Sequence, residues 1–213
     1  MISEKAEKRL EEFVLSCCES YTIDESHGLK HSKGCMKWAS MLVRADPNIT
    51  EEQSMMAIYA AGLHDMCDKK YTDPVEASER ILVWLIKGEG WPRHVAKALI
   101  AIINTMSYSW LKSRVVNGML VFPDHGKWQK AYHIARHADL LDGYIVARCF
   151  LYGKHANPSI SDGECWKKVR DLFEVRVFRY VSDGWIVLPE AVSLAAILDE
   201  KARSDLDMLN QTY

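Results

Sequence analysis

The chain has 213 residues, of which 48% are hydrophobic and 26% charged, and its formal net charge is −2. A chain of this length typically forms one domain and can bury a core without disulfides. The near-neutral charge argues against a dedicated nucleic-acid-binding protein, because such proteins usually carry a basic excess or a basic stripe. A small anionic substrate is compatible with this net charge, since a local group of lysines is enough to bind it.

The six cysteines form no C-x-x-C pair and no regular spacing, which is typical of buried thiols in a reducing compartment. Residues 1–18 alternate charged and apolar side chains and lack the continuous apolar stretch of a signal peptide. No apolar run reaches the roughly 18 residues that span a bilayer. We therefore expect a cytoplasmic protein with no membrane partner.

Apolar residues recur at helical spacing through the first half of the chain. Capping signals mark two of the helix starts, namely the capping box at Thr50–Gln53 and the N-cap and proline at Asp73-Pro74. Five helices are expected there: one with an apolar stripe from Ala6 to Cys17, one after Ser26 that carries Leu29 to Leu42, one from Thr50 through Leu63 to His64-Asp65, one from Pro74 to Gly88, and one that begins at Trp91-Pro92.

The second half is also helical, apart from a less regular segment at 107–126 that predicts a loop with a short helix. A long helix is expected from about Lys127 to Tyr152, with Ile134, Ala138, Leu141 and Ile145 on one face. Another capping box, at 161–164, predicts a helix to about residue 181, and Leu188-Pro189 begins a last helix to about residue 209. No linker or repeat divides the chain, so the predicted fold class is a single all-α domain covering residues 1–213.

Two histidines and two aspartates on three of the expected helices form a mixed nitrogen and oxygen set that suits a divalent first-row cation: His31, His64, Asp65 and Asp139. Ligands from separate helices would leave coordination positions open for water and substrate. Alternatives stay open for each residue. A histidine near a helix start is often a cap, Asp65 could be an exposed helix end, and Asp139 and Asp142 could pair with Arg136 or a lysine.

The order of these residues resembles the signature H…HD…D of the HD-domain metal-dependent phosphohydrolase superfamily. The closest likeness is to its small stand-alone members, through Asp24-x-Ser26-His27-x-x-x-His31, Leu63-His64-Asp65 and Ala138-Asp139-x-Leu141-Asp142. The resemblance spans about residues 21–151. It implies an HD-type helical bundle with its metal-site core in that range and additional C-terminal helices at 161–209.

The resemblance implies a role for each matching residue. The metal ligands would be His31, His64, Asp65 and Asp139, holding one divalent ion, which could be manganese, magnesium, cobalt, iron, nickel or zinc. Asp68, four residues after His64, would be the catalytic acid or base. We further expect the substrate to be contacted by His27, Lys69, Lys70 and Asp142. For the two lysines, a solvated helix end that complements the helix dipole is an equal alternative.

The chain also departs from the family pattern. Many relatives of this type carry Arg-Val three and four residues after the first ligand histidine, and this chain has Gly34-Cys35. The role of that arginine, in packing or in phosphate contact, is then missing or has moved to a nearby lysine: Lys30, Lys33 or Lys37.

The function expected from these residues is hydrolysis of a nucleotide or another small phosphorylated metabolite by a metal-activated water. One alternative is a mixed-metal oxygenase on the same scaffold, whose second metal would need extra histidines such as His94 or His125. Another is a non-catalytic binding module. The sequence leaves the oligomeric state open, and a homo-oligomer is compatible with it.

Overall fold

The computed structural model describes residues 2–210, and its fold is all-α. Within that range the helices are α1 (Glu4–Tyr21), α2 (Leu29–Ala45), α3 (Glu51–Leu63), α4 (Pro74–Lys87), α5 (Arg93–Ile103), α6 (Tyr108–Lys112), α7 (Gln129–Asp142), α8 (Val146–Ala156), α9 (Asp162–Val175) and α10 (Pro189–Asn210). Three short 3-10 helices accompany them: η1 (His64–Cys67), η2 (Gly126–Trp128) and η3 (Val177–Arg179). The described part contains no helix with the length and apolarity needed to cross a membrane.

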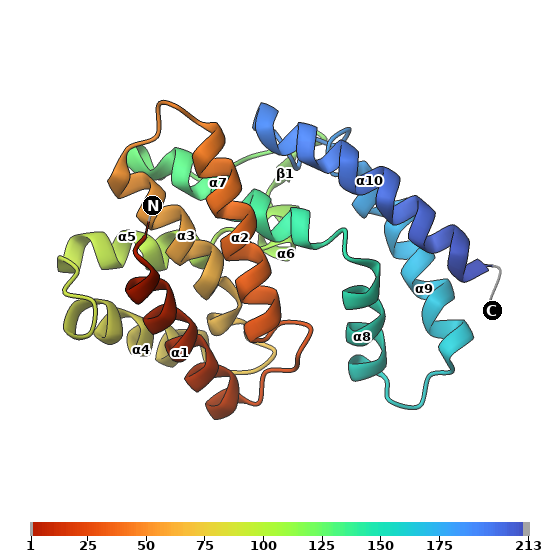
Figure 1. Ribbon diagram of the computed structural model, residues 1–213, viewed down its shortest axis with the longest axis horizontal. Helices are drawn as coiled ribbons and strands as arrows, with labels where there is room; N and C mark the ends of the chain where they lie inside the picture. The colour runs from red at the N-terminus through yellow and green to blue at the C-terminus, as the bar shows by residue number, and fades with distance from the viewer. Residues whose placement is uncertain (1, 211–213) are drawn as a thin grey trace.

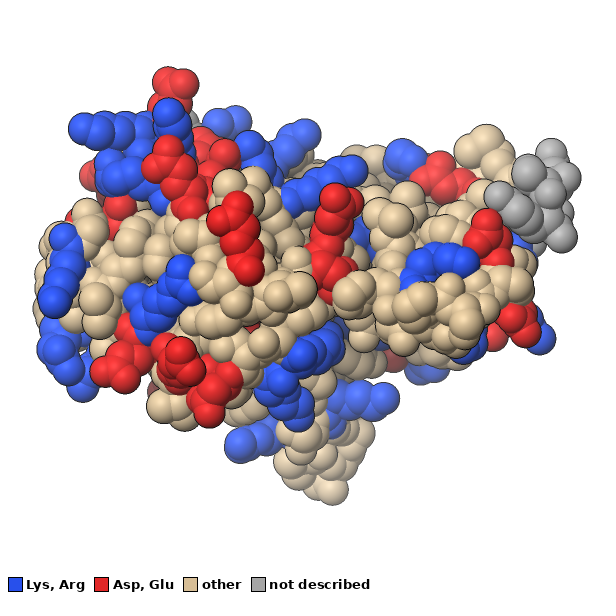
Figure 2. Space-filling view, turned by 90° about the horizontal axis from the view of Figure 1, so that it is seen from below, with Lys and Arg blue, Asp and Glu red and all other residues tan. Residues whose placement is uncertain are grey.

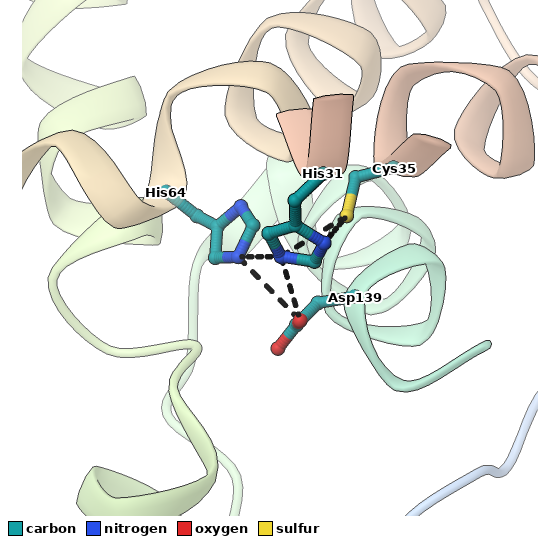
Figure 3. Close-up of side chains that lie close together, drawn as sticks. All are labelled: His31, Cys35, His64 and Asp139. Atoms are coloured by element: carbon teal, nitrogen blue, oxygen red, sulfur yellow. Dashed lines mark hydrogen bonds and ion pairs between the residues drawn. The ribbon is translucent and has the colours of Figure 1, made fainter. Parts of the chain in front are cut away.

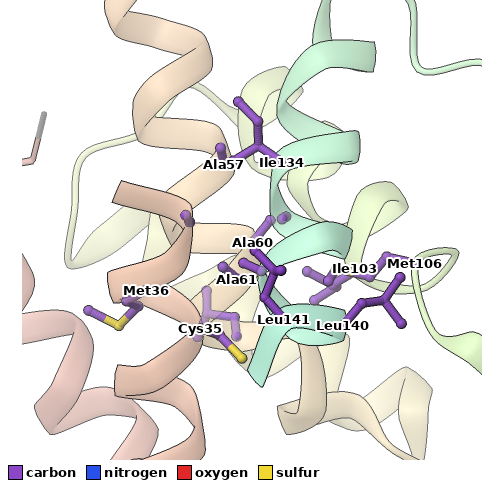
Figure 4. Packing of buried hydrophobic residues seen from close by; sticks show 14 of the residues in the cluster. Cys35, Met36, Ala57, Ala60, Ala61, Ile103, Met106, Ile134, Leu140 and Leu141 are labelled. Carbon is purple, nitrogen blue, oxygen red and sulfur yellow. The ribbon is translucent and has the colours of Figure 1, made fainter. Parts of the chain in front are cut away.

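Helices α2, α3 and α7 pack against one another and form the centre of the core, with α1 and α5 also packed against α3 (Figure 1). Every residue from Met56 to Leu63 is buried, so this helix has no solvent-facing stripe. Its alanines at 57, 60 and 61 are small enough to let both neighbouring helices approach closely (Figure 4). A Cβ at Gly62 would lie 3.0 Å from Met36 Sδ, so this glycine also sets the close approach of α2.

Helices α8, α9 and α10 lie beside this bundle rather than inside it (Figure 1). Helix α8 packs against α9, and the long α10 runs back to contact α7 and α2. A chain reversal after α7 therefore brings residues from the last third of the protein next to the end of α7.

The long helix expected from Lys127 to Tyr152 is wrong in its extent, because the chain breaks it after Asp142. Helix α7 ends there, Gly143 caps it, and α8 begins at Val146. Tyr144 between them is 4% exposed, and the turn buries its ring in the core. A Cβ at Gly143 would lie 2.9 Å from the Leu140 carbonyl oxygen, so a glycine suits this tight helix end.

Three other boundaries differ from the expected ones. Helix α3 stops at Leu63, and His64-Asp65 lie on the tighter helix η1. Helix α9 ends at Val175, because Arg176 leaves helical geometry with φ −138°. The segment expected as a loop contains an antiparallel hairpin, β1 (Val115–Val116) and β2 (Met119–Leu120), whose turn residues Asn117 and Gly118 both have positive φ. Asn-Gly favours this kind of two-residue hairpin turn.

Acidic and basic side chains are interspersed over the face of the molecule that Figure 2 shows. No stripe of lysine and arginine alone crosses that face. This mixed surface agrees with the near-neutral net charge and gives no support to nucleic-acid binding there.

Candidate metal centre and adjoining cavity

The four predicted ligands meet at one place. His31 lies in the first turn of α2, His64 and Asp65 lie on η1, and Asp139 lies near the end of α7. The Nε2 atoms of His31 and His64 are 3.3 Å apart. His31 Nε2 lies 3.4 Å from Asp65 Oδ2 and 3.4 Å from Asp139 Oδ1. His64 Nε2 lies 3.4 Å and 3.5 Å from the same two oxygens. Figure 3 shows His31, His64 and Asp139 converging from their three elements.

This spacing suits donors around a single ion. Two donors that bind one ion at about 2.1 Å lie about 3.0 Å apart at an octahedral angle and about 3.4 Å apart at a tetrahedral angle. Five of the six distances among these four atoms lie at 3.3–3.5 Å, within about 0.5 Å of both values. The side chains therefore already stand where ligands would stand.

The His64 ring is oriented by the backbone of its own helix. Its Nδ1 lies 2.9 Å from the Ala61 carbonyl oxygen. Because a carbonyl oxygen only accepts, Nδ1 must donate this hydrogen bond and carry the proton of the neutral ring. The Nε2 atom then presents its lone pair to the centre, which is the tautomer that binds a metal.

The His31 ring is oriented in the same way by a carboxylate. Asp142 Oδ2 accepts a hydrogen bond from His31 Nδ1 at 2.6 Å. Asp142 is 2% exposed and does not line the cavity described below. The geometry gives no support to the prediction that Asp142 contacts substrate, because its carboxylate lies outside the cavity lining and holds the His31 ring.

The Gly34-Cys35 departure from the family pattern has a steric reason in this chain. A Cβ at Gly34 would lie 2.4 Å from Asp142 Oδ1, so only a glycine leaves room for the carboxylate that holds His31. Asp142 also lies 3.4 Å from Arg148 Nε, on the following helix α8. An arginine thus reaches this region from α8, and none of the lysines considered in α2 replaces it.

Cys35 joins the centre as a further candidate ligand that the sequence interpretation missed. The ligand atoms of His31, Cys35, His64 and Asp139 all lie within 4.8 Å of one another, so these four could hold a metal ion. Cys35 Sγ lies 3.6 Å from each nitrogen of the His31 ring, one helical turn after it. Burial raises the pKa of this thiol to about 12, which disfavours the thiolate form that binds metals.

The electrostatics of the centre favour a cation. Burial by itself would raise the pKa of both Asp65 and Asp139, but the protonated His64 and His31 rings outweigh it and hold both pKa values below the ordinary range. The carboxylates are therefore ionised. The pKa values of the two rings are raised in turn, despite burial, by the acidic groups around them. A bound metal ion would replace the Nε2 protons and leave the rings in the neutral form described above. Asp65 Oδ2 is buried and accepts no hydrogen bond within the described residues. Its partners are the two ring nitrogens at 3.4 Å, which are too far to hydrogen-bond it well, and a bound cation between them would compensate its charge more fully.

A cavity of about 300 Å³ opens beside the centre. Its walls come from the metal-centre residues, the start of α6, helix α8 and the end of α9. Six of the predicted site residues line it: His27, His31, Asp65, Asp68, Lys70 and Asp139. Lys69 is exposed and lies outside the wall, which agrees with the solvated alternative for that residue.

His27 enters the cavity wall on a hydrogen-bonded support. It precedes α2 and does not share the helix of His31. Tyr71 and the Ser26 hydroxyl both donate to Asp24. Burial raises the pKa of Asp24, but these hydrogen bonds lower it by more, to about 2. Since the Ser26 hydroxyl hydrogen is used on Asp24, His27 Nδ1 donates to Ser26 Oγ at 2.8 Å. The His27 ring is therefore held by an ionised buried carboxylate through Ser26.

Asp68 and Lys70 form an ion pair at the cavity mouth. Asp68 does not stand one α-helical turn beyond His64, because the chain there is a 3-10 helix that ends at Cys67. Its Oδ1 accepts from the Lys70 backbone N–H at 2.9 Å, and its Oδ2 lies 3.2 Å from Lys70 Nζ. Both side chains line the cavity. The structure thus places the predicted acid or base next to a cation.

Two arginines and three tyrosines also line the cavity: Arg148, Arg176, Tyr108, Tyr152 and Tyr180. Their sequence positions carry no periodic or motif signal that would have identified them. Arg148 and Tyr152 lie on α8, Arg176 and Tyr180 follow α9, and Tyr108 begins α6. His94 and His125 do not line it. His94 is exposed, and His125 Nε2 lies 3.0 Å from Thr105 Oγ1.

Comparison with known proteins gives a fold match. The chain is similar to a crystal structure of a Lactobacillus plantarum protein determined as a structural genomics target. The TM-score is 0.62 at 18% sequence identity, and the match covers 100% of this chain and 98% of that one. At this identity the likeness establishes the shared fold alone. No family model and no curated protein matches the chain.

Proposed function

We propose that the protein is a metal-dependent phosphohydrolase acting on a nucleotide or another small phosphorylated metabolite. The observation that carries the proposal is that two oriented Nε2 atoms each lie within 3.5 Å of two ionised carboxylates. Three of these four residues line a cavity that contains cationic side chains. The sequence resemblance to HD-domain phosphohydrolases supports the same reading.

Asp65, rather than Cys35, is the fourth ligand in this proposal. Its Oδ2 is 3.4 Å from both ligand nitrogens and lacks a hydrogen-bond partner, whereas the Cys35 thiol is kept protonated by burial. Imidazole and carboxylate together suit a borderline divalent ion. When bound, such an ion would lower the pKa of a coordinated water toward about 7 and polarise a phosphate oxygen.

The other cavity residues have roles in the proposal that follow from their charges. Lys70 and Arg148 would neutralise the phosphate that is hydrolysed, since they lie on the wall nearest Asp68 and Asp142. Asp68 would accept or orient the proton of the attacking water. His27, held by Ser26 and Asp24, would contact the substrate or its leaving group.

The positions of the remaining histidines support hydrolysis over oxygenation. A mixed-metal oxygenase would need further ligands beside the first set, and His94 and His125 both lie outside the cavity wall. The cavity beside the metal centre, with Lys70 and Arg148 in its wall, likewise supports an enzyme that acts on an anionic substrate rather than a non-catalytic binding module. All six cysteines are free, which supports a reducing compartment and a cytoplasmic location.

The test combines metal analysis of the purified protein with a phosphate-release screen over nucleotides, sugar phosphates and inorganic polyphosphates, each with Mn²⁺, Mg²⁺, Co²⁺, Ni²⁺, Fe²⁺ or Zn²⁺. Asp65→Ala should lose both bound metal and turnover. It should also lose the increase in Tm that added metal gives the wild type, because binding stabilises only the native state. Asp207→Asn, an exposed aspartate on α10, is the matched control and should behave as wild type. Full metal content and turnover in Asp65→Ala would contradict the proposal.

A further inference from the structure

Arg176 differs from the other cations of the cavity in having no acidic partner. Lys70 pairs with Asp68 at 3.2 Å, and Arg148 lies 3.4 Å from Asp142 and donates to the Ser26 carbonyl oxygen at 3.0 Å. Within residues 2–210, no carboxylate lies within ion-pair distance of Arg176. Its charge is therefore available to a ligand.

The Arg176 guanidinium is nevertheless held in a fixed position. Its Cζ lies 3.6 Å from the centroid of the Tyr108 ring, so the guanidinium makes a direct cation–π contact with that ring. Its Nε donates to Tyr180 Oη at 3.0 Å. Tyr180 is 2% exposed, which makes it a rigid support. These two contacts use one face and one N–H of the guanidinium and leave its two terminal nitrogens for another acceptor.

A guanidinium with two free terminal nitrogens in a concave site matches the oxygens of a phosphate or carboxylate group. Arg176 reaches this site from the end of α9, where the chain leaves helical geometry immediately before η3. Its neighbours on the wall are Tyr108, Tyr180 and Val177, whereas the metal-centre residues lie on α2, η1 and α7. No ion pair, hydrogen bond or ring contact joins it to any of the four proposed metal ligands in the described part of the chain.

The cavity thus has two places for negative charge. One is the part of the wall where Lys70 and Arg148 lie, beside Asp68 and the residues that support the metal centre. The other is at Arg176, beside Tyr108 and Tyr180. A ligand that fills the cavity with a single phosphate would satisfy only the first. A ligand with two anionic groups would satisfy both, including the half-buried Arg176, which has no acidic partner.

We propose that Arg176 is a specificity residue that binds a second, non-reacting anionic group of the substrate, so that the preferred substrates carry two anionic groups. This inference rests on the proposed function, because it takes the metal centre as the place where one phosphate is hydrolysed. The second group can be a phosphate or a carboxylate, since both offer the two oxygens that the guanidinium fork binds.

Binding of non-hydrolysable probes tests the inference without turnover. We would measure methylenediphosphonate, phosphonoacetate and methylphosphonate by calorimetry on the metal-loaded wild type, Arg176→Gln and Arg176→Lys. Wild type should bind the first two at least about 10-fold more tightly than methylphosphonate, the usual size of a charge-assisted contact. Arg176→Gln should remove this preference, Arg176→Lys should keep part of it, and methylphosphonate affinity should change less than about 3-fold. Whichever of the two probes with two anionic groups binds more tightly identifies the second group.

Arg179→Gln is the matched control, because this neighbouring arginine pairs with Asp183 on the exposed surface and does not line the cavity. It should bind all three probes as wild type does. Equal loss of affinity for all probes in Arg176→Gln, or no loss for any, would overturn the inference. Absence of phosphate release from every substrate in wild type would instead overturn the proposed function, whatever the probe preference. The two failures are therefore distinguishable.

Discussion

Asp142→Asn separates the support role of this carboxylate from the substrate-binding role expected from the sequence. The substitution keeps the shape of the side chain and an oxygen that can accept from His31 Nδ1, but it removes the negative charge. In the structure that charge lies 2.6 Å from His31 Nδ1 and 3.4 Å from Arg148 Nε, and the side chain is 2% exposed. The variant therefore loses a charge-assisted hydrogen bond and part of the compensation of a buried cation.

Two magnitudes follow from that environment. A hydrogen bond to a charged group contributes about 1.5–3 kcal/mol and one between neutral groups about 0.5–1.5 kcal/mol, so the metal-free variant should lose about 1–2 kcal/mol of its free energy of unfolding. Carboxylates that orient a ligating histidine typically change metal affinity by about 10–100-fold, and the variant should show a loss in that range. The His31 ring would keep its position less firmly and would be a weaker base toward the ion.

Urea denaturation of metal-free protein and metal titration against a competing chelator measure these two quantities. Turnover at saturating metal should recover substantially, with little change in KM. Unchanged stability and metal affinity together with a raised KM would refute this reasoning and would restore Asp142 to the substrate. Asp199→Asn is the control, since this aspartate pairs with Arg203 on the surface of α10.

Three further predictions follow from the structure. Gly34→Ala should destabilise the protein by about 1–3 kcal/mol and weaken metal binding, because the new Cβ would lie 2.4 Å from Asp142 Oδ1; wild-type stability and metal affinity would contradict the steric account. Asp68→Asn should keep its metal but lower kcat by about 10²–10⁴-fold, as loss of a positioned acid or base does, and metal content measured beside steady-state rates distinguishes this from loss of a ligand. Burial and the Arg136 cation lower the pKa of His133 to about 4, so the unfolded chain takes up a proton at this residue first as the pH falls, and stability should decrease from about pH 6.5 to about pH 4. In urea titrations across this range His133→Gln should show a shallower decrease than wild type, and parallel curves would contradict the assignment.

The convergence of side chains at the candidate metal centre could largely be predicted from the sequence, because the residue types and their order are visible there. His64-Asp65 follow a buried apolar helix, and Asp139 borders the apolar stripe of α7. The same spacing argument led to the prediction that Asp142, three residues later on that helix, contacts the substrate, which the geometry does not support. Spacing shows that two carboxylates share a face, but not that one of them turns behind a histidine of another helix.

The cavity wall could not be predicted, because tertiary packing alone brings it together. Apolar residues continue at helical spacing past Gly143, so the sequence favours one long helix. The structure has two helices, α7 and α8, joined by a turn that buries Tyr144. Only that break allows α8 and α9 to fold back and place Arg148 and Arg176 at the site. The hairpin of β1 and β2, unlike the cavity wall, could have been predicted from the sequence. Its Asn-Gly turn favours a hairpin, but the surrounding glycines and proline led to the prediction of a loop.

The central claim is tested most directly by a crystal structure of the manganese-loaded protein with anomalous diffraction at the manganese edge. We expect one anomalous peak, contacted by the Nε2 atoms of His31 and His64 and by carboxylate oxygens of Asp65 and Asp139. A peak bound through Cys35 in place of Asp65 would contradict the ligand assignment. A manganese-soaked crystal with no peak between these four side chains would contradict the metal centre itself.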